Sequence, residues 1–314
     1  MSAAASPPVT APTLGLHLPH FGPLADAGVL DRVIDVAEGC GLATLWAGDH
    51  VALPADVASR YPYHESGSAS FDHDAPYFDA ITLLTHAAAR TSRVRVGLSV
   101  LVVPYRHPLV TAKLLATLDQ LSRGRLDIGV GIGWMREEFD ILGVPFTRRG
   151  ALTDAALDVL LSAFAGSPIA CDNEDYPFPA VGVRPLPLQQ PRPPIVVGGH
   201  SEPAMRRALR VGDGWQATAS SAEELAQLVG QLRGLAGGSL PPHFEIGSRI
   251  HLPRFDAGDV PDARIIDLLA GYVRAGAHHL LVDLWDRDPD RYLARLEAVA
   301  GWLDTYAGVA RRLA

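Results

Sequence analysis

The stretch that decides the fold is residues 94–132, VRVGLSVLVVPYRHPLVTAKLLATLDQLSRGRLDIGVGI. An apolar run at 94–103 is followed by an amphipathic stretch that begins at Pro108, and a second apolar run occupies 125–132. Short apolar runs bounded by turn residues predict buried strands, and helical spacing between them predicts a helix. Ser122-Arg123-Gly124 is typical of the end of such a helix. The stretch is therefore a β-α-β unit of a parallel sheet.

The same alternation continues in both directions along the chain. Six further strands are predicted at 14–19, 43–48, 194–199, 214–218, 245–252 and 278–284. Eight βα units joined by right-handed crossovers predict a (β/α)8 TIM barrel, an α/β fold that occupies residues 13–314 as one domain after a loose tail at 1–12. A doubly wound sheet is the weaker alternative, because it leaves some units without a place. Two insertions interrupt the barrel, 51–76 after strand 2 and 166–193 before strand 5.

Composition excludes several classes of protein. The net charge of -8 argues against a nucleic-acid partner, which requires clustered basic residues. No apolar run approaches the length of a membrane span, and the first residues lack the pattern of a signal peptide, so a cytoplasmic protein is expected. The two cysteines receive no role, and the His and Asp residues of 64–79 match no metal-ligand spacing, which favours an acidic lid over a metal site.

Polar residues gather where the predicted strands end. Asp49 and His50 follow strand 2, Ser99 lies in strand 3, and Gly131, Gly133 and Trp134 end strand 4. In this barrel the carboxyl ends of the strands line the active site. Taken alone, Asp49-His50 is equally consistent with a helix cap beside an exposed histidine. The glycines of GVGIGW do not have dinucleotide-fold spacing, and they are expected to let a flat ring lie against the strand end.

The segment VVGGHSEPAMRRA, residues 196–208, places two glycines between a strand and a helix. Glycine lets backbone amides approach an anion, and a helix N-terminus favours negative charge, so a phosphate is the expected ligand. An ordinary short βα turn is the alternative.

These segments together resemble the bacterial luciferase-like superfamily, in particular its actinobacterial branch that uses the deazaflavin coenzyme F420. The resemblance covers roughly residues 13–305, and it rests on LWAGDH, SRYPY, PPIVVGGHSEPAMRRALRVGDGW and the long segment 94–150. It implies a ring system across the barrel mouth, with its phosphate held by the amides of Val197, Gly198, Gly199 and His200. It also implies a cis peptide bond between Ser99 and Val100 behind the ring.

The resemblance implies roles for the Asp-His pair as well. His50 is expected to be the acid/base for the substrate, with Asp49 orienting it. This chain departs from the sugar-phosphate dehydrogenases of the superfamily at Trp134, where those enzymes have a glutamate. Its carboxylates Glu137 and Glu138 come later, so the sugar-phosphate reaction is not inherited.

Three functions remain open on this basis. The first is an F420-dependent oxidoreductase that transfers hydride to or from a small organic substrate, with Arg60, Arg106 and Arg136 as candidates to bind the acidic coenzyme tail. The second is an FMN-dependent monooxygenase supplied with reduced FMN by a separate reductase. The third is a barrel that binds the coenzyme without turnover. The resemblance implies a homodimer, and a flavin or F420 reductase is a possible electron supplier.

Overall fold

The computed structural model describes residues 12–63, 67, 72–252 and 263–313 of the 314-residue chain. The predicted tail lies outside the described residues except for Pro12, and so does much of the predicted acidic lid. No helix in the described part of the chain combines the length and the apolar character that a membrane span needs.

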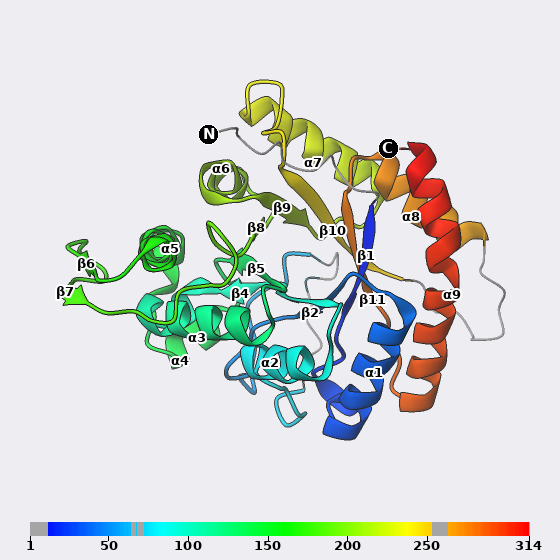
Figure 1. Cartoon of the computed structure of the whole chain (residues 1–314), viewed down its shortest axis with the longest axis horizontal. Helices are drawn as coiled ribbons and strands as arrows, with labels where there is room; N and C mark the ends of the chain where they lie inside the picture. The colour runs from blue at the N-terminus through cyan, green and yellow to red at the C-terminus, as the bar shows by residue number, and fades with distance from the viewer. Residues whose placement is uncertain (1–11, 64–66, 68–71, 253–262, 314) are drawn as a thin grey trace.

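A closed barrel of parallel strands forms the centre of the molecule, as predicted (Figure 1). Its ring order is β1, β2, β3, β5, β8, β9, β10 and β11, and β11 pairs with β1 to close the ring. The barrel strands are β1 (Thr13–His17), β2 (Thr44–Ala47), β3 (Arg95–Leu98), β4 (Leu101–Val102), β5 (Leu126–Gly131), β8 (Ile195–Gly198), β9 (Gly214–Ala217), β10 (Glu245–His251) and β11 (His279–Asp283). The predicted strand at 94–103 is divided into β3 and β4, and the Ser99–Val100 peptide bond between them is cis.

Helices surround the barrel, and α1 and α9 lie side by side on its outside (Figure 1). Their bounds are α1 (Ala27–Cys40), α2 (Ala80–Arg90), α3 (Pro108–Leu121), α4 (Arg136–Ile141), α5 (Arg149–Ala165), α6 (Glu202–Val211), α7 (Ala222–Leu235), α8 (Ala263–Arg274) and α9 (Pro289–Leu313), with 3-10 turns η1 (Gly22–Leu24), η2 (Val103–Tyr105) and η3 (Phe146–Arg148). Asp26 caps α1 by accepting from the Gly28 and Val29 amides. Such caps satisfy amides that would otherwise lack partners at a helix start.

The second insertion contains a hairpin that the sequence pattern does not predict. β6 (Ile169–Cys171) and β7 (Phe178–Val181) pair antiparallel beside α5, at the left of Figure 1. The segment that follows β7 is hydrogen-bonded to α3. The fully buried carboxylate of Asp119 accepts from the amides of Leu188 at 2.7 Å and Gln189 at 2.9 Å.

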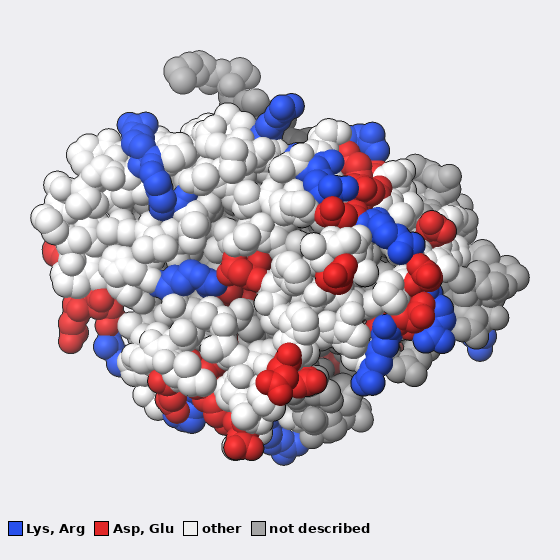
Figure 2. All heavy atoms as spheres, turned by 90° about the horizontal axis from the view of Figure 1, so that it is seen from below, with Lys and Arg blue, Asp and Glu red and all other residues white. Residues whose placement is uncertain are grey.

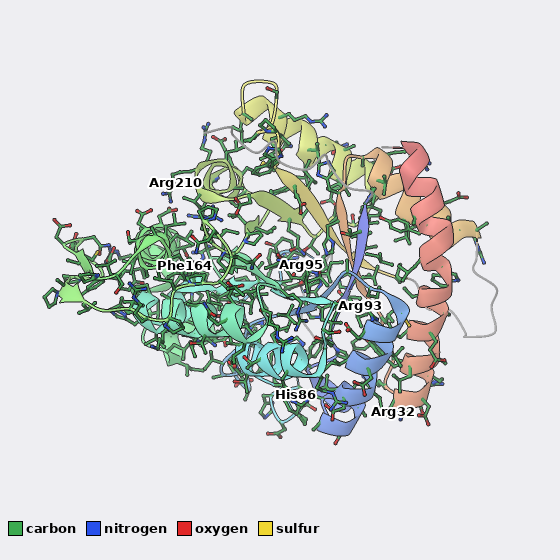
Figure 3. All side chains as sticks on the ribbon, in the orientation of Figure 1. Arg32, His86, Arg93, Arg95, Phe164 and Arg210 are labelled. Carbon is green, nitrogen blue, oxygen red and sulfur yellow. The ribbon has the colours of Figure 1, made fainter. Side chains whose placement is uncertain are left out.

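Ion pairs join the outer elements and close the amino-terminal end of the barrel. Arg95, labelled near the centre of Figure 3, binds Asp127 of the neighbouring strand through two nitrogens at 2.8 and 2.5 Å. His86 on α2 contacts Asp31 on α1. On the face shown in Figure 2, acidic and basic side chains are interspersed rather than gathered by sign.

Candidate active site

The predicted site residues from distant strands meet at the carboxyl end of the barrel. Aromatic rings form a continuous path across this end, from the loop after β8 to the loop after β2. His200 contacts Tyr63 with ring centroids 5.1 Å apart, Tyr63 contacts Tyr61 at 5.6 Å, Tyr61 contacts Trp134 at 5.2 Å, and Trp134 contacts His50 at 6.3 Å. Both tyrosines come from the first insertion, so the described residues Tyr61 and Tyr63 of this segment lie at the barrel mouth.

His50 is held by a carboxylate from α4. Its Nδ1 lies 2.6 Å from Glu138 Oε2, and the side chain of Glu138 is fully buried. Glu138 Oε2 also accepts from the Tyr105 hydroxyl at 2.8 Å, while Oε1 accepts from the amides of Val51 and Ala52. An ionised carboxylate only accepts hydrogen bonds, so the proton on this side of the ring is carried by Nδ1. In the neutral ring Nε2 is then the basic nitrogen.

The environment of Glu138 favours its charged form. Burial alone would raise the pKa of the carboxyl group, but the hydrogen bond from His50 and the two amide donors hold it below its ordinary value. The sequence placed Glu137 and Glu138 beyond the strand end and did not predict this contact. The helix α4 turns directly after β5, and this turn brings Glu138 back to the mouth.

Asp49 has a different partner from the one expected. Its buried carboxylate accepts from Arg106 at 2.7 and 2.9 Å in a bidentate pair and from the Val102 amide at 3.0 Å. Arg106 also reaches Asp79 at 3.2 Å. Asp49 therefore fixes the loop after β4, and the carboxylate that orients His50 is Glu138. Arg106 is also engaged by these two acids, and its pKa is raised by them against the opposing effect of burial.

The glycines at the ends of β5 and β8 make room for protein side chains. A Cβ on Gly131 would lie 2.4 Å from Val100 Cγ2, and one on Gly198 would lie 2.9 Å from Val100 Cγ1. A Cβ on Gly133 would lie 2.6 Å from Phe139. Gly131 and Gly133 were expected to let a flat ring lie against the strand end; in the structure, the space that their own side chains would fill is taken by Val100 and Phe139. The cis bond at Ser99–Val100 is present as expected, and Gln216 Nε2 donates to Ser99 Oγ at 3.1 Å.

The loop after β8 has some of the features of an anion site. Gly199 has φ +121, and the Ser201 side chain caps α6. The Gly199 amide donates to the Gln216 carbonyl at 3.3 Å, so one of the expected phosphate donors is already used. His200 Nε2 accepts from the Thr218 amide at 3.0 Å, and burial lowers the pKa of this imidazole. The Tyr63 hydroxyl lies 3.7 Å from a Cβ built on Gly199, so the first insertion reaches this loop.

A second polar cluster was not predicted as a unit. Asp283 of β11 binds Arg249 of β10 at 2.7 and 3.1 Å, His251 at 2.9 Å and His17 of β1 at 3.5 Å. Burial opposes the charged form of Asp283, but Arg249 and His17 hold its pKa far below the usual range. Burial lowers the pKa of His17 well below its ordinary value, with a further contribution from Arg249. A signal was present in the sequence, since the predicted strands at 245–252 and 278–284 each contain a charged residue in their carboxyl-terminal half, Arg249 and Asp283.

One buried polar atom at the mouth has no protein partner in the described part of the chain. It is His17 Nε2, which lies 3.6 Å from a Cβ built on Gly48. The same point lies 3.6 Å from the Tyr77 hydroxyl and 3.5 Å from the Ser99 carbonyl oxygen. A heteroaromatic ring with polar edges would supply the missing hydrogen bond, so the residues present fit a flavin-type ring at this place.

Comparison with known proteins extends this description. A family model described as luciferase-like monooxygenase matches residues 15–253. Rv0940c of Mycobacterium tuberculosis is 32% identical over 242 residues, which are 75% of this chain and 82% of that protein. The FMNH(2)-dependent dimethylsulfone monooxygenase of Pseudomonas putida is 28% identical over 201 residues, 62% of this chain and 55% of that protein. The coenzyme F420 dependent tetrahydromethanopterin reductase of Methanopyrus kandleri has the same fold, with a TM-score of 0.71 and 18% identity over 93% of this chain and 98% of that chain.

Proposed function

This chain belongs to the luciferase-like monooxygenase family, and from that premise we propose that it is an F420-dependent oxidoreductase acting on a small organic substrate. The observation that carries the proposal is the pair formed by His50 and Glu138, with 2.6 Å between Nδ1 and Oε2. The pair supplies what hydride chemistry on an alcohol or carbonyl requires from the protein, a group that exchanges a proton with the substrate oxygen.

His50 performs the proton step in this proposal. As a substrate C–H bond breaks and its electron pair leaves as hydride, the hydroxyl proton moves to His50 Nε2. In the reductive direction the same nitrogen returns the proton to the substrate oxygen. The imidazolium formed in the first case is stabilised by the ionised Glu138 beside it, which also keeps the ring in one orientation.

A deazaflavin held at the mouth would supply the carbon that accepts or gives hydride, and it does not activate oxygen. His17 and Ser99 are the side chains that would meet the ring, and the backbone from Val197 to His200 is proposed to hold its phosphate. Trp134 and Tyr61 would exclude water around His50. The proposed substrate is a small molecule with an oxidisable alcohol or a reducible carbonyl, because the interconversion of these two groups requires the proton exchange described.

A monooxygenase using reduced FMN is the second candidate, and the relative in Pseudomonas putida favours it. In that case a separate reductase would deliver the reduced flavin. The third candidate, coenzyme binding without turnover, assigns no proton transfer to His50.

The coenzyme is tested by anaerobic titration of the purified protein with F420 and with FMN, followed by absorbance and fluorescence. We expect F420 to bind more tightly and its reduced form to be oxidised only when a substrate is present. Oxygen uptake with reduced FMN, in the absence of any F420 binding, would replace this proposal with the second candidate.

His50 is tested separately. The His50→Ala variant is expected to lose turnover by roughly 10²-fold or more while the dissociation constant for the coenzyme stays within about twofold. The exposed His86→Ala variant on α2 is the matched control. Equal turnover in the His50 variant and the wild type would remove the proton step.

A further inference from the structure

The hydroxyl group of Tyr105 shares one oxygen of Glu138 with His50. The Tyr105 hydroxyl lies 2.8 Å from Glu138 Oε2, and His50 Nδ1 lies 2.6 Å from the same oxygen. We propose that Tyr105 is a positioning residue, whose hydroxyl fixes Glu138 Oε2 at the point from which this oxygen orients the His50 ring. The consequence for turnover rests on the proposed function, whereas the hold on the imidazole does not.

The other donors to Glu138 come from the loop that also carries His50. Glu138 Oε1 accepts from the amides of Val51 at 2.6 Å and Ala52 at 3.1 Å, which directly follow His50 in the loop after β2. These three donors belong to one segment, so they would move together if that loop moved. Tyr105 belongs to a different element, η2, which follows β4. Its hydroxyl therefore relates the position of the carboxylate to the barrel as well as to the loop.

Packing fixes the ring of Tyr105. The ring makes an edge-on contact with the buried Phe139, with centroids 4.9 Å apart, and both residues belong to an apolar cluster with Val102. Phe139 directly follows Glu138 on α4, so one tyrosine contacts both residues. Close packing confines interior side chains to single rotamers. The place of the hydroxyl is thus set by the ring, and it determines where the carboxylate oxygen lies.

The hydroxyl of Tyr105 is a permanent donor. Burial raises the pKa of this phenol far above its ordinary value, and the negative charge of Glu138 and the hydrogen bond to it act in the same direction. The group therefore stays protonated over the pH range in which folded proteins normally work. An ionised carboxylate only accepts, so the direction of this hydrogen bond is fixed as well.

The residue after Tyr105 acts on the other member of the Asp-His pair. Arg106 binds the buried carboxylate of Asp49 at 2.7 and 2.9 Å. Two consecutive residues after β4 therefore hold two consecutive residues after β2, Arg106 directly and Tyr105 through Glu138. This arrangement supports a positioning role, because both contacts place the loop of His50 relative to the barrel wall.

The Tyr105→Phe variant tests the hold on His50 without coenzyme or substrate. Phenylalanine keeps the packed ring and removes only the hydroxyl. The Nδ1 proton of His50 is followed by proton NMR and is assigned by its absence from the His50→Ala variant. We expect this proton to exchange with water roughly tenfold faster in Tyr105→Phe than in the wild type, because fewer donors then hold the oxygen that binds it. If the wild type lacks a slowly exchanging His50 signal, the ring is not held and the proposal is overturned.

Tyr272→Phe is the matched control. The Tyr272 hydroxyl is buried and donates to the Ala219 carbonyl at 2.9 Å, so this variant also loses one buried hydrogen bond. Both variants should lower the urea midpoint by similar amounts. The exchange rate at His50 should change only in Tyr105→Phe. Equal exchange rates in Tyr105→Phe and the wild type would show that Tyr105 does not position the imidazole.

The turnover arm separates positioning from binding. We expect kcat of Tyr105→Phe to fall roughly tenfold, while KM and the dissociation constant of the coenzyme stay within about twofold, because the hydroxyl fixes the base and does not touch the ligand. When Tyr105→Phe is added to Glu138→Gln, the further loss should be less than about twofold, since Tyr105 acts through Glu138. A full additional tenfold loss in that background would mean that Tyr105 acts by another route, and would overturn the proposal.

The outcomes distinguish this inference from the proposed function. If His50 exchange is faster in Tyr105→Phe but no F420-dependent turnover is found, the positioning role stands and the proposed function fails. If turnover depends on F420 and the variant changes neither kcat nor the exchange rate, the proposed function stands and the positioning role is wrong. Faster exchange with an unchanged kcat would overturn the consequence for turnover.

Discussion

The buried carboxylate of Glu138 accepts several hydrogen bonds. It accepts from His50, from the Tyr105 hydroxyl and from two backbone amides, and its side chain has no exposed surface. A carboxylate surrounded by donors in this way stays ionised in spite of burial, because each donor stabilises the negative charge. The orientation of His50 therefore depends on a residue 88 positions away in the sequence.

The Glu138→Gln variant tests this dependence. A glutamine keeps the volume of the side chain but removes the charge that stabilises an imidazolium, so turnover is expected to fall roughly 10²-fold with little change in coenzyme affinity. In this variant, both the turnover rate and the way in which turnover depends on pH should differ from those of the wild type. Asp140→Asn, an exposed carboxylate on the same helix, is the control and should leave both unchanged.

The residue scale is where the sequence predicted least. Asp49 was expected to orient His50 because the family resemblance implies these roles for the adjacent pair. Adjacent residues of an extended segment point in opposite directions, however, so their side chains have different neighbours. Asp49 faces Arg106, and His50 faces Glu138. The approach of α4 to the loop after β2 is a tertiary contact for which no local pattern exists.

At the scale of elements, the sequence pattern located every barrel strand to within about two residues. Apolar runs at 125–132 and 194–199 became β5 and β8 because both faces of a barrel strand are buried and leave a continuous apolar signal. The hairpin of β6 and β7 was missed. Its strands are short and contain no buried residue, so they lack the apolar alternation from which a strand is predicted.

Substitutions at two glycines, one closely packed and one with open space beside it, test how tightly the elements pack. A Cβ on Gly129 in β5 would lie 1.8 Å from the Leu98 carbonyl oxygen, whereas one on Gly230 in α7 meets nothing within 4 Å. Gly129→Ala is expected to lower the free energy of unfolding by roughly 3 kcal/mol or more, since backbone must move. Gly230→Ala should raise it by about 0.5–1 kcal/mol, because alanine restricts the unfolded helix segment. Urea denaturation midpoints measure both. A stable Gly129 variant would contradict the described packing of β3 on β5.

For the whole molecule, the barrel closes where the first and last strands meet. β1 pairs with β11 over Thr13 to Leu16, and the cluster around Asp283 joins the ends of β1, β10 and β11. The closure of a ring from distant parts of the chain was predictable, because eight βα units of one handedness leave no other neighbour for the last strand. The ionic cluster at the closure was not predictable from the strand patterns.

Low pH should reduce the stability that the ionic cluster around Asp283 contributes where the barrel closes. Asp283 has a pKa that is depressed in the folded protein, so its contribution to stability is complete above its unfolded value of about 3.9 and is lost as the pH falls toward the folded value. Asp283→Asn is expected to lower the free energy of unfolding at neutral pH by roughly 3–5 kcal/mol, since it leaves Arg249 buried without its partner. The variant should also show a weaker loss of stability below about pH 4. Asp290→Asn, an exposed partner of Arg32, is the control and should behave as the wild type.

The attachment of the second insertion has a consequence for how this protein can diversify. Asp119 on α3 fastens Leu188 and Gln189, and Ser167 Oγ accepts from the Val183 amide at 3.0 Å, so the chain on each side of the hairpin is secured before β8 begins. Any segment that replaces the hairpin would begin and end at these two attachment points. The hairpin can therefore be exchanged for another segment beside the barrel without changing the path of the barrel strands.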